Sequence, residues 1–384
     1  MIPYGRQHIT DDDVAAVEAV LRSDFLTQGP AVPAFEKALA DYCGADHAVA
    51  VNSATSALHI ACLALGVTEG DVVWTTPNTF VASANCARYC GAMVDFVDID
   101  PETFNMCADA LAAKLAVADA LPKVVIPVHF SGHSCDMAAI AALAEQYGFK
   151  VIEDASHAVG GRYRDQPVGN CAYSDITVFS FHPVKIITSA EGGVALTNDA
   201  GLQRKMDRLR SHGVTRNPDD LTNLDAGPWH YEMLELGLNY RMTDMQAALG
   251  LSQMQRLDEL VARRQVLADR YDVLLADLPV LRPGRAAGAY SAWHLYCIQI
   301  DERQTNHSRR QVFETLRADG IGVNVHYIPV HTQPYYRGQG FKPGDFPLSE
   351  AYYKNAITIP LYATMSNAQQ DEVVAALKRA LGVA

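Results

Sequence analysis

Long apolar runs are absent from this chain of 384 residues. No stretch approaches the about 18 consecutive apolar residues that a membrane-spanning helix needs. The opening MIPYGRQHITDDDV also lacks the basic segment and apolar core of a signal peptide. Positive charge is scarce, because 31 lysine and arginine residues face 44 aspartate and glutamate residues, a formal net charge of −13. We therefore expect a cytoplasmic protein whose partners are neither nucleic acid nor an anionic membrane.

Patterns of paired cysteines are absent as well. The eight cysteines are scattered without a CxxC pair, so we expect reduced, mostly buried thiols.

HFSGH, at 129–133, has an HxxxH spacing but no acidic third ligand in a known pattern, and no metal site is predicted. The GxSxG motif, a GxGxxG loop after the first strand and a Walker A loop are missing. Serine hydrolases, nicotinamide-dependent enzymes and P-loop enzymes are therefore unsupported.

Apolar residues are plentiful. They make up 49% of the chain, against 20% charged residues, which allows two domains or one large domain with an appendage. From about residue 45 to 200, short apolar runs alternate with helical patterns. The expected strands are 47–52, 71–76, 93–99, 123–130, 149–154 and 175–181, and an amphipathic helix is expected at 137–148. This alternation predicts βαβ units and a mostly parallel sheet with helices on both faces.

The pattern changes in the last third of the chain. Residues 251–278 form a long helical pattern without a strand break, and a smaller α+β segment follows, with a strand at 294–300 and a last helix at 371–381. We therefore predict an α/β chain with a large domain at 1–252 and a small C-terminal domain at 253–384. No Gly/Ser-rich linker separates them, so they are expected to be tightly joined.

Small hydroxyl residues lie at the junction of the first strand and the helix after it. In NSATSALH the strand ends at Asn52, then Ser53, Thr55 and Ser56 follow as the helix begins. A helix N-terminus offers free N–H groups and the positive end of the helix dipole, so the junction can bind an anion. Serine and threonine are equally typical of an ordinary helix cap, which is the alternative.

A carboxylate follows the apolar strand at 149–154. Asp154, in VIEDASHAVGG, lies where an open α/β sheet binds ligands, outside the carboxyl end of a strand. A partly buried carboxylate needs a cation or a donor as its partner, and His157 lies close behind it. The pair suits a metal, a catalytic triad or a protonated heterocycle. A loop carboxylate that caps the next turn is the alternative.

A single lysine follows the strand at 175–181. Pro183 cannot extend a central strand, so Lys185 in SFHPVK falls at or just past the strand end. Ser180 lies near it, and Gly192–Gly193 then turn the chain into VALTN. A lysine in a buried cleft has a lowered pKa and acts as a nucleophile toward a carbonyl. A surface lysine with a buried stem is the alternative.

The order of these three clusters resembles that of a known family. A phosphate-type loop, a strand-end aspartate and a strand-end lysine follow one another as in the fold-type I aminotransferases that use pyridoxal 5'-phosphate. More narrowly, the chain resembles the DegT/DnrJ/EryC1/StrS sugar aminotransferases. The stretches that resemble the family are LTQGP, NSATSAL, TTPNTFVASAN, EDASHAVG, SFHPVK with AEGG, GLNYRMTDMQAALG and VHYIPVHTQPYY. The resemblance spans essentially the whole chain and implies a large domain with a mostly parallel sheet between helices, plus a smaller C-terminal α+β domain.

The resemblance also implies roles for individual residues. Lys185 would carry the pyridoxal phosphate cofactor and move the proton between substrate and cofactor. Asp154 would pair with the ring nitrogen of the cofactor and keep it protonated. Phe80 would stack on the ring, with core packing as its alternative, and His157 stands where relatives often have a glutamine that contacts the ring hydroxyl. The residues implied for the cofactor phosphate are Ala54, Thr55, Ser56 and Ser180.

A homodimer with a shared active site is implied as well. Asn239, in GLNYRM, would reach the cofactor phosphate of the partner subunit, with Arg241 nearby. A surface loop without such a role is the alternative, because one sequence does not show an interface.

The substrate is implied by fewer residues. HPVK with AEGG, the start IPYGRQHIT and LTQG are similar to a family branch that acts in pseudaminic acid biosynthesis. That branch moves an amino group from L-glutamate to C4 of a UDP-linked 4-keto-6-deoxy-N-acetylhexosamine. The implied substrate contacts are Tyr4, Leu26, Thr27, Ala54, Ser180, His326 and Tyr327.

Other activities remain as alternatives. A dTDP- or GDP-linked 4-keto sugar is the nearest one. Sugar dehydration is disfavoured, because relatives that catalyse it have histidine in place of Lys185. A non-catalytic regulator is disfavoured by the lack of a segment suited to bind DNA and by the negative net charge.

Overall fold

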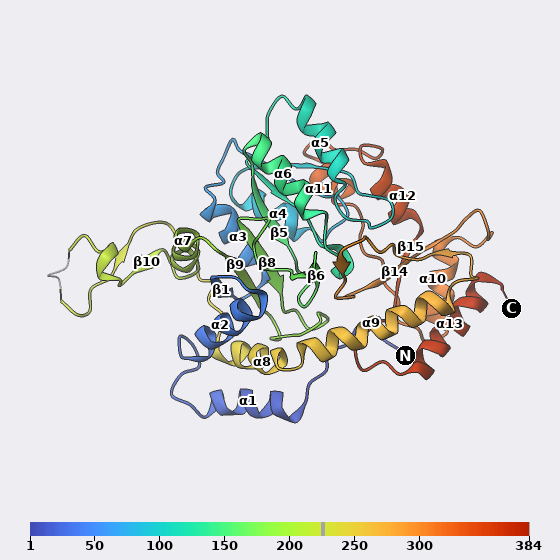
Figure 1. The fold of residues 1–384 in the computed structure, drawn as a ribbon, viewed down its shortest axis with the longest axis horizontal. Coiled ribbons are helices and arrows are strands. Elements are labelled where there is room, and N and C mark those ends of the chain that lie inside the picture. Colours follow the sequence, from blue (N-terminus) through green and yellow to red (C-terminus); the bar gives the residue numbers. More distant parts are fainter. Residues whose placement is uncertain (224–226, 384) are drawn as a thin grey trace.

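The computed structural model describes residues 1–223 and 227–383. Its centre is a seven-stranded sheet in the order β1-β9-β8-β5-β4-β2-β3 (Figure 1). The strands are β1 (His47–Val51), β2 (Val72–Thr75), β3 (Met93–Phe96), β4 (Val124–Ile126), β5 (Lys150–Asp154), β8 (Ile176–Ser180) and β9 (Gly193–Thr197). Within this sheet only β9 runs antiparallel to its neighbours, so the predicted mostly parallel sheet is confirmed.

Helices cover both faces of the sheet, as β4 illustrates. Val124 and Ile126 belong to the core cluster of α3, α4 and α7, whereas Val125 belongs to that of α5 and α6. Over β1, β8 and β9 the second face is covered by α2, α8 and α9. The helices are α2 (Ala31–Cys43), α3 (Ala54–Ala64), α4 (Ala82–Tyr89), α5 (Ala108–Val117), α6 (Met137–Tyr147), α7 (Ala200–Arg210), α8 (Asp244–Met254) and α9 (Leu257–Leu274). Burial on both faces explains why these strands are near-continuous apolar runs.

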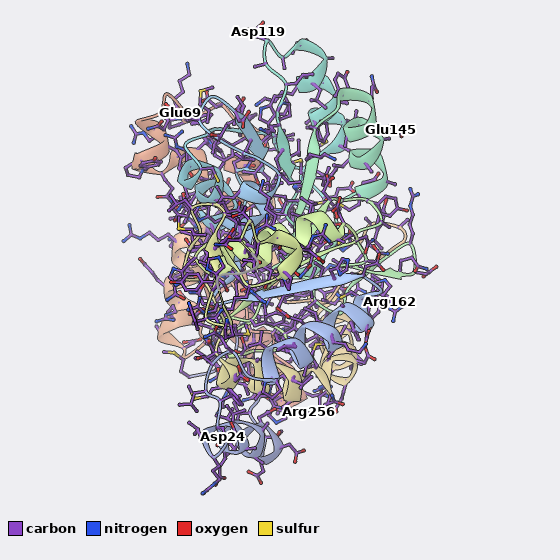
Figure 2. All side chains as sticks on the ribbon, turned by 90° about the vertical axis from the view of Figure 1, so that its left-hand side faces the viewer. Asp24, Glu69, Asp119, Glu145, Arg162 and Arg256 are labelled. Carbon is purple, nitrogen blue, oxygen red and sulfur yellow. The ribbon has the colours of Figure 1, made fainter. Side chains whose placement is uncertain are left out.

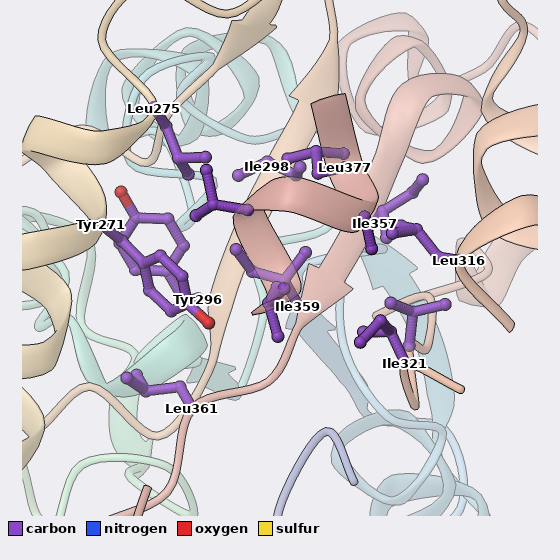
Figure 3. Close-up of a cluster of buried hydrophobic side chains, with 14 of the residues drawn as sticks. Tyr271, Leu275, Tyr296, Ile298, Leu316, Ile321, Ile357, Ile359, Leu361 and Leu377 are labelled. Atoms are coloured by element: carbon purple, nitrogen blue, oxygen red, sulfur yellow. The ribbon is translucent and has the colours of Figure 1, made fainter. Parts of the chain in front are cut away.

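A second core lies in the C-terminal part of the chain, which we call the C-terminal lobe (Figure 3). A three-stranded antiparallel sheet, in the order β12-β14-β15, packs there against α9, α10 and α13. The new elements are β12 (Val280–Leu281), β14 (Tyr296–Ile300), β15 (Ala356–Ile359), α10 (Arg309–Ala318) and α13 (Asn367–Leu381). The predicted strand at 294–300 and the last helix are confirmed, and the helix begins earlier than expected because Ser366 and Gln369 form a capping box.

The long helical pattern at 251–278 is divided between two helices rather than continuous. α8 ends at Met254 and α9 begins at Leu257. α9 then contributes to both cores, because its Leu260 packs below the large sheet and its Tyr271 packs in the C-terminal lobe. Ile2, at the opposite end of the chain, also packs in that lobe. The division at residue 252 stays a prediction, since these segments join the two parts.

A buried carboxylate fixes α1 (Asp11–Leu21) to the break between α8 and α9. Asp13 forms a capping box with Thr10 at the start of the helix. It also accepts hydrogen bonds from Ser252, Gln253 and Arg256, at 2.7 Å each. Burial raises the pKa of Asp13, but the bonds from Ser252 and its other donors outweigh this effect and hold the pKa below its usual value. Asp13 is therefore an ionised anchor between three helices.

The remaining elements surround these cores. They are β6 (Arg162–Tyr163), β7 (Gln166–Pro167), β10 (Val214–Thr215), β11 (Glu232–Met233), β13 (Ala289–Tyr290), α11 (Pro334–Arg337), α12 (Pro347–Asn355) and 3-10 turns at Phe130–Gly132, Pro218–Asp220 and Val330–Thr332. β10 and β11 pair in a ribbon that projects from the body, at the left of Figure 1. Exposed large apolar side chains lie on β11 and directly before and after it, namely Trp229, Tyr231, Met233, Leu234 and Leu236.

The outside of the molecule is charged. Figure 2 shows Asp119 at one end of the molecule and Asp24 at the other, with Glu69 and Glu145 also pointing outward. All eight cysteines are free thiols and six of them are buried, so the expectation of mostly buried thiols is confirmed. Over the described residues, no helix combines the length and apolar character needed to cross a membrane.

We expect Asp13→Ala to lower the free energy of unfolding by about 3 kcal/mol, because it removes a buried charge and leaves Arg256 and the neighbouring donors unpaired. Urea unfolding followed by circular dichroism measures the change. Asp11→Ala, at the exposed start of the same helix, is the matched control and should change stability by less than about 0.5 kcal/mol. Equal losses in the two variants would contradict the anchor role.

Candidate active site

The carboxyl ends of β1, β2, β5 and β8 meet at one edge of the large sheet, because these strands run in the same direction. A cavity of about 540 Å³ opens at this edge, between the sheet and segments of the C-terminal lobe. The predicted site residues that line it are Tyr4, Ala54, Thr55, Phe80, Asp154, His157, Ser180, Lys185, His326 and Tyr327. The topology thus brings most of the predicted site together.

Asp154 is fixed through both of its carboxylate oxygens. Ser83 Oγ donates to Oδ2 at 2.6 Å, and the Ser156 amide donates to Oδ1 at 3.1 Å. Because Ser83 gives its only hydroxyl proton to Asp154, Thr79 Oγ1 is the donor in its 2.8 Å bond with Ser83 Oγ. This relay holds the buried carboxylate in one orientation at the cavity wall, where a protonated ring nitrogen can pair with it.

Lys185 lies in the loop after β8. Its amide donates to His182 O at 2.9 Å and closes a turn, and its half-buried side chain faces the cavity. Burial lowers the pKa of the Lys185 ammonium to about 8, although the charge of Asp154 acts in the opposite direction. Part of the amine is therefore uncharged near neutral pH, which is the form that attacks a carbonyl carbon. This geometry favours the cleft lysine over the surface alternative.

The first turn of α3 forms another wall of the cavity. Ser53 caps the helix and accepts a hydrogen bond from the Ser56 amide at 3.1 Å, so the expected cap is present. The amides of Ala54 and Thr55 belong to the first turn, which has no acceptor within the helix, and both residues line the cavity. The same turn can therefore be a cap and an anion site, so the two alternatives are compatible.

Gly193 makes this wall possible by close packing. A Cβ atom at Gly193 would lie only 2.5 Å from Ala54 N and 2.6 Å from the carbonyl carbon of Ser53. Because side-chain atoms do not approach backbone atoms so closely, any other residue would displace the start of α3. The glycine that was expected to turn the chain thus has a second task, which is to let β9 touch the anion site.

Phe80 follows β2 and is 57% exposed. This exposure excludes core packing, which was the alternative for this residue. Its ring lines the cavity at 6.3 Å from the ring of Tyr327, measured between centroids. An exposed apolar ring at a cavity is suited to stacking on an aromatic ligand.

His157 is buried and bonded through both ring nitrogens. The Ser131 amide donates to Nδ1 at 3.2 Å, and the Tyr327 hydroxyl lies 3.2 Å from Nε2. Burial and the nearby Lys185 charge hold the pKa of His157 well below its usual value, so the ring is neutral. An amide can only donate, so the single ring proton lies on Nε2 and is donated to Tyr327 Oη. The Tyr327 proton is then available to a ligand.

His326 brings a second neutral imidazole to the cavity. Burial and the Lys185 charge lower the pKa of His326 to about 3, and its Nδ1 lies 2.7 Å from Thr358 Oγ1. The Tyr4 ring is 5.5 Å away between centroids, and the Tyr4 carbonyl accepts from the Leu361 amide at 3.0 Å. The N-terminal segment is therefore bound to the C-terminal lobe beside the cavity.

Some cavity residues were not expected from the sequence. They are Thr79, Ser83, Ser156, His182, Glu191, His294 and Asn324, besides the apolar ones. His294 is buried, its ring centroid is 4.5 Å from that of His157, and its Nδ1 has no partner among the described residues. His294 is the first residue of the strand predicted at 294–300. A polar residue in that apolar pattern was the feature of the sequence that could have indicated a place in the cavity.

Four predicted site residues do not line the cavity of their own chain, namely Leu26, Thr27, Ser56 and Asn239. The Ser56 hydroxyl donates to Asn52 Oδ1 at 2.6 Å, inside the helix cap, and so is turned away from a ligand. Leu26, Thr27 and Asn239 are exposed. Their predicted contacts require either a large substrate or a second subunit.

The HxxxH pair at 129–133 is part of the fold. His129 Nε2 lies 2.7 Å from Glu153 Oε2, and His133 Nε2 accepts from the Ala286 amide at 3.1 Å. The two histidines therefore serve separate contacts. Within 1–223 and 227–383, no three His, Cys, Asp or Glu side chains are grouped so that they could hold a metal ion.

Comparison with known proteins decides the family. A sequence model of the DegT/DnrJ/EryC1/StrS aminotransferase family matches residues 7–378. The chain belongs to this family. SpsC of Bacillus subtilis, a spore coat polysaccharide biosynthesis protein, is 40% identical over 380 residues, which are 98% of this chain and 96% of SpsC. The resemblance inferred from the sequence motifs is thereby confirmed.

Solved structures share the fold over almost the full length. PseC of Helicobacter pylori, an aminotransferase involved in the biosynthesis of pseudaminic acid, has a TM-score of 0.91 at 30% identity and 99% coverage of both chains. Spr1654 of Streptococcus pneumoniae, described as a sugar aminotransferase, has a TM-score of 0.90 at 30% identity in its PMP form, with 100% and 99% coverage. It is also solved in a PLP form. This DegT/DnrJ/EryC1/StrS member is thus a sugar aminotransferase that uses pyridoxal phosphate.

The residues at the cavity fit that cofactor. The amides at the start of α3 suit a phosphate, the fixed Asp154 suits a protonated ring nitrogen, and the Lys185 amine suits an aldehyde. Gly193 keeps the space beside Ala54 that a side chain would fill.

We expect Lys185 in the cofactor-free protein to titrate near pH 8, because burial disfavours its charged form. Asp154→Asn should lower the midpoint further, since the Asp154 charge stabilises the ammonium. The rate of amine acylation against pH, read for each lysine by peptide mass spectrometry, measures both. The exposed Lys37 is the control in the same digest. A Lys185 midpoint at or above that of Lys37 would refute the effect of burial.

Proposed function

We propose that this enzyme transfers an amino group from L-glutamate to C4 of a UDP-linked 4-keto-6-deoxy-N-acetylhexosamine, as in pseudaminic acid biosynthesis. The observation behind the proposal is one cavity that holds the Lys185 amine, the fixed Asp154 carboxylate and polar side chains of the C-terminal lobe. The likeness to PseC over 99% of both chains supports this substrate class. Eight free cysteines support a cytoplasmic location, which is part of the proposal.

Lys185 and Asp154 are the proposed catalytic residues. Pyridoxal phosphate, when bound, supplies an aldehyde for the amino group and a ring that draws electrons from the bond being broken. Lys185 Nζ, partly uncharged near neutral pH, takes a proton from Cα of L-glutamate and delivers one to C4 of the sugar. Asp154, already oriented by Ser83 and Ser156, keeps a ring nitrogen protonated without having to move.

The cofactor is proposed to be held by groups that the fold fixes in advance. The amides of Ala54 and Thr55, with the Ser180 hydroxyl, bind the phosphate, and the Phe80 ring stacks on the cofactor ring. The Ser56 hydroxyl donates to Asn52. Ser56 therefore stabilises the helix cap and does not bind the phosphate through its hydroxyl. His157 stays neutral beside the ring hydroxyl of the cofactor, and its Nε2 orients the Tyr327 hydroxyl.

The sugar is proposed to lie against the C-terminal lobe. Tyr4, His326 and Tyr327 face the cavity there and offer hydroxyl and imidazole groups as donors and acceptors. Ala54 and Ser180, at the sheet edge, complete the proposed sugar contacts. Because His326 and Tyr327 are neutral, they suit hydroxyl and acetamido groups rather than an ionised sugar.

A different nucleotide-linked 4-keto sugar is the second candidate. The 40% identity to SpsC exceeds the 30% identity to PseC. SpsC is named for spore coat polysaccharide biosynthesis. In this second candidate the substrate is a dTDP- or GDP-linked 4-keto sugar that is used for a surface polysaccharide.

We also propose a homodimer with shared active sites. Asn239 is exposed and lies outside its own cavity, close to the ribbon whose Trp229 and Leu236 are 74% and 83% exposed. Apolar side chains exposed on a projecting ribbon are typical of an interface between subunits. Asn239 then reaches the cofactor phosphate in the partner's cavity, and Leu26 and Thr27 meet substrate beside that interface.

We expect the enzyme loaded with pyridoxal phosphate to aminate the UDP-linked 4-keto sugar with L-glutamate. Its kcat/KM should be about 100-fold lower for dTDP- and GDP-linked counterparts, because a site built to hydrogen-bond one base rejects others. Formation of 2-oxoglutarate and the mass of the sugar product measure this. A faster reaction with dTDP or GDP sugars would favour the second candidate. If glutamate still converts the bound cofactor but no 4-keto sugar is aminated, the substrate class is wrong.

Lys185→Ala should abolish turnover, and Asn239→Ala should lower it at least about tenfold by weakening the phosphate site of the partner subunit. After mixing and re-pairing, the two variants should recover roughly a quarter of wild-type activity, because half of the dimers are mixed and each has one intact site. Steady-state rates before and after re-pairing measure the recovery. Activities that simply average would show that each site belongs to one chain.

A further inference from the structure

His294 has hydrogen-bonding capacity that the chain does not use. Its side chain is 5% exposed and lines the cavity. Nδ1 is enclosed without a partner among the described residues, and none of these residues bonds to Nε2 either. The other buried imidazoles of the cavity are occupied, because His157 bonds through both ring nitrogens and His326 bonds to Thr358 and Asn324. The capacity of His294 is therefore left for a ligand.

The enclosure of Nδ1 determines where the His294 proton lies. Burial, and after it the charge of Lys185, holds the pKa of His294 well below its usual value, so the ring is neutral and has one N–H group. A proton on Nδ1 would be an enclosed donor without an acceptor, which costs free energy. The proton therefore lies on Nε2, where a ligand can accept it. A donor in this place is suited to a carboxylate oxygen.

A buried positive charge lies next to His294. Arg264, on α9, is 2% exposed, and its Nη1 donates to the carbonyl oxygens of Trp293, His294 and Leu361 at 3.1, 3.3 and 3.0 Å. Burial lowers the pKa of Arg264 to about 10, which leaves the guanidinium charged at neutral pH. Among the described residues no carboxylate forms an ion pair with it, and its Nε is enclosed without a partner. Because a buried cation without a counter-ion is costly, the surroundings of His294 favour an anion.

The proposed amino donor brings such an anion into the cavity. L-glutamate has two carboxylates, whereas Lys185 is the only lysine or arginine among the described residues that line the cavity. Because the Lys185 amine is the proposed nucleophile toward the cofactor aldehyde, it is not available as a counter-ion. The Asp154 carboxylate, in the same cavity, adds negative charge. A carboxylate of the donor therefore needs a partner elsewhere on the wall, and His294 offers an unused N–H group with a positive charge beside it.

We propose that His294 Nε2 donates a hydrogen bond to a carboxylate of L-glutamate, and that the unpaired charge of Arg264 stabilises this carboxylate from behind the cavity wall. The inference rests on the proposed function, because L-glutamate is the proposed donor. The same neutral N–H group can donate to a hydroxyl when the sugar takes the place of glutamate. One cavity can thus accept a charged amino acid and a neutral sugar ring in turn.

Substitution of His294 in the holoenzyme tests the contact. His294→Phe keeps a ring against His157, which lies 4.5 Å away between centroids, but removes the N–H group. We expect the dissociation constant of glutarate, a dicarboxylate without an amine, to rise about tenfold by calorimetry. The glutamate concentration that half-saturates conversion of the bound cofactor, followed by absorbance, should rise equally. The maximal rate of that conversion should change less than about threefold, since the N–H group binds the donor and does not move a proton.

Two further variants separate hydrogen bonding from general disturbance. His294→Gln keeps a donor, so glutarate binding should weaken less than about threefold. His47→Gln is the matched control, because His47 lies at the start of β1, the end away from the cavity, and it should behave as wild type. Equal weakening in His294→Phe and His294→Gln would overturn the role of the N–H group.

The two arms distinguish this inference from the proposed function. Wild-type holoenzyme that L-glutamate does not convert would overturn the proposed donor, whereas conversion that is half-saturated at the same glutamate concentration in wild type and His294→Phe would overturn this inference alone. A crystal structure of the wild-type holoenzyme with glutarate decides the contact even if a variant does not fold. A carboxylate oxygen within about 3.2 Å of His294 Nε2 is expected, and a glutarate bound elsewhere in the cavity would overturn the contact.

Discussion

The parallel pairing of β5 with β8 is the constraint on which the site depends. Because Asp154 lies opposite Val178 in this pair, the carboxylate at the end of one strand stands beside the loop that leaves the other. β9 then returns between β8 and β1 in the reverse direction, and its first residue, Gly193, meets the cap of α3. One reversed strand in a parallel sheet thus gathers an amine, a carboxylate and an anion site at a single edge.

Burial determines which side chains at that edge are charged. His157, His294 and His326 are kept unprotonated mainly by desolvation, and the Lys185 charge adds to the effect. The imidazoles therefore supply directed hydrogen bonds without charge. The pKa of Lys185 lies near neutral pH because burial lowers it, while the Asp154 charge acts in the opposite direction. Such a site can select neutral sugar groups and still move a proton, because these two tasks fall to different side chains.

The sequence located what local pattern determines. Asp154 and Lys185 follow apolar runs that are buried on both faces, so their positions at strand ends did not require the topology. His294 reaches the cavity only through packing of the C-terminal lobe, and a histidine at the start of a strand is also compatible with a core position. Ser56 shows a different limit, because helix caps and phosphate loops have the same composition. The role of Asn239 stays a prediction, since a surface that two chains complete leaves no pattern in one.

The helix α9 has a mechanical consequence. It is 18 residues long, with its first half in the core below the large sheet and its second half in the core of the C-terminal lobe. A helix embedded at both ends opposes a hinge motion between the two cores, because such a motion would have to bend the helix or disrupt one of the cores. We therefore expect the loops at the rim of the cavity, rather than a hinge between the two cores, to admit and release ligands.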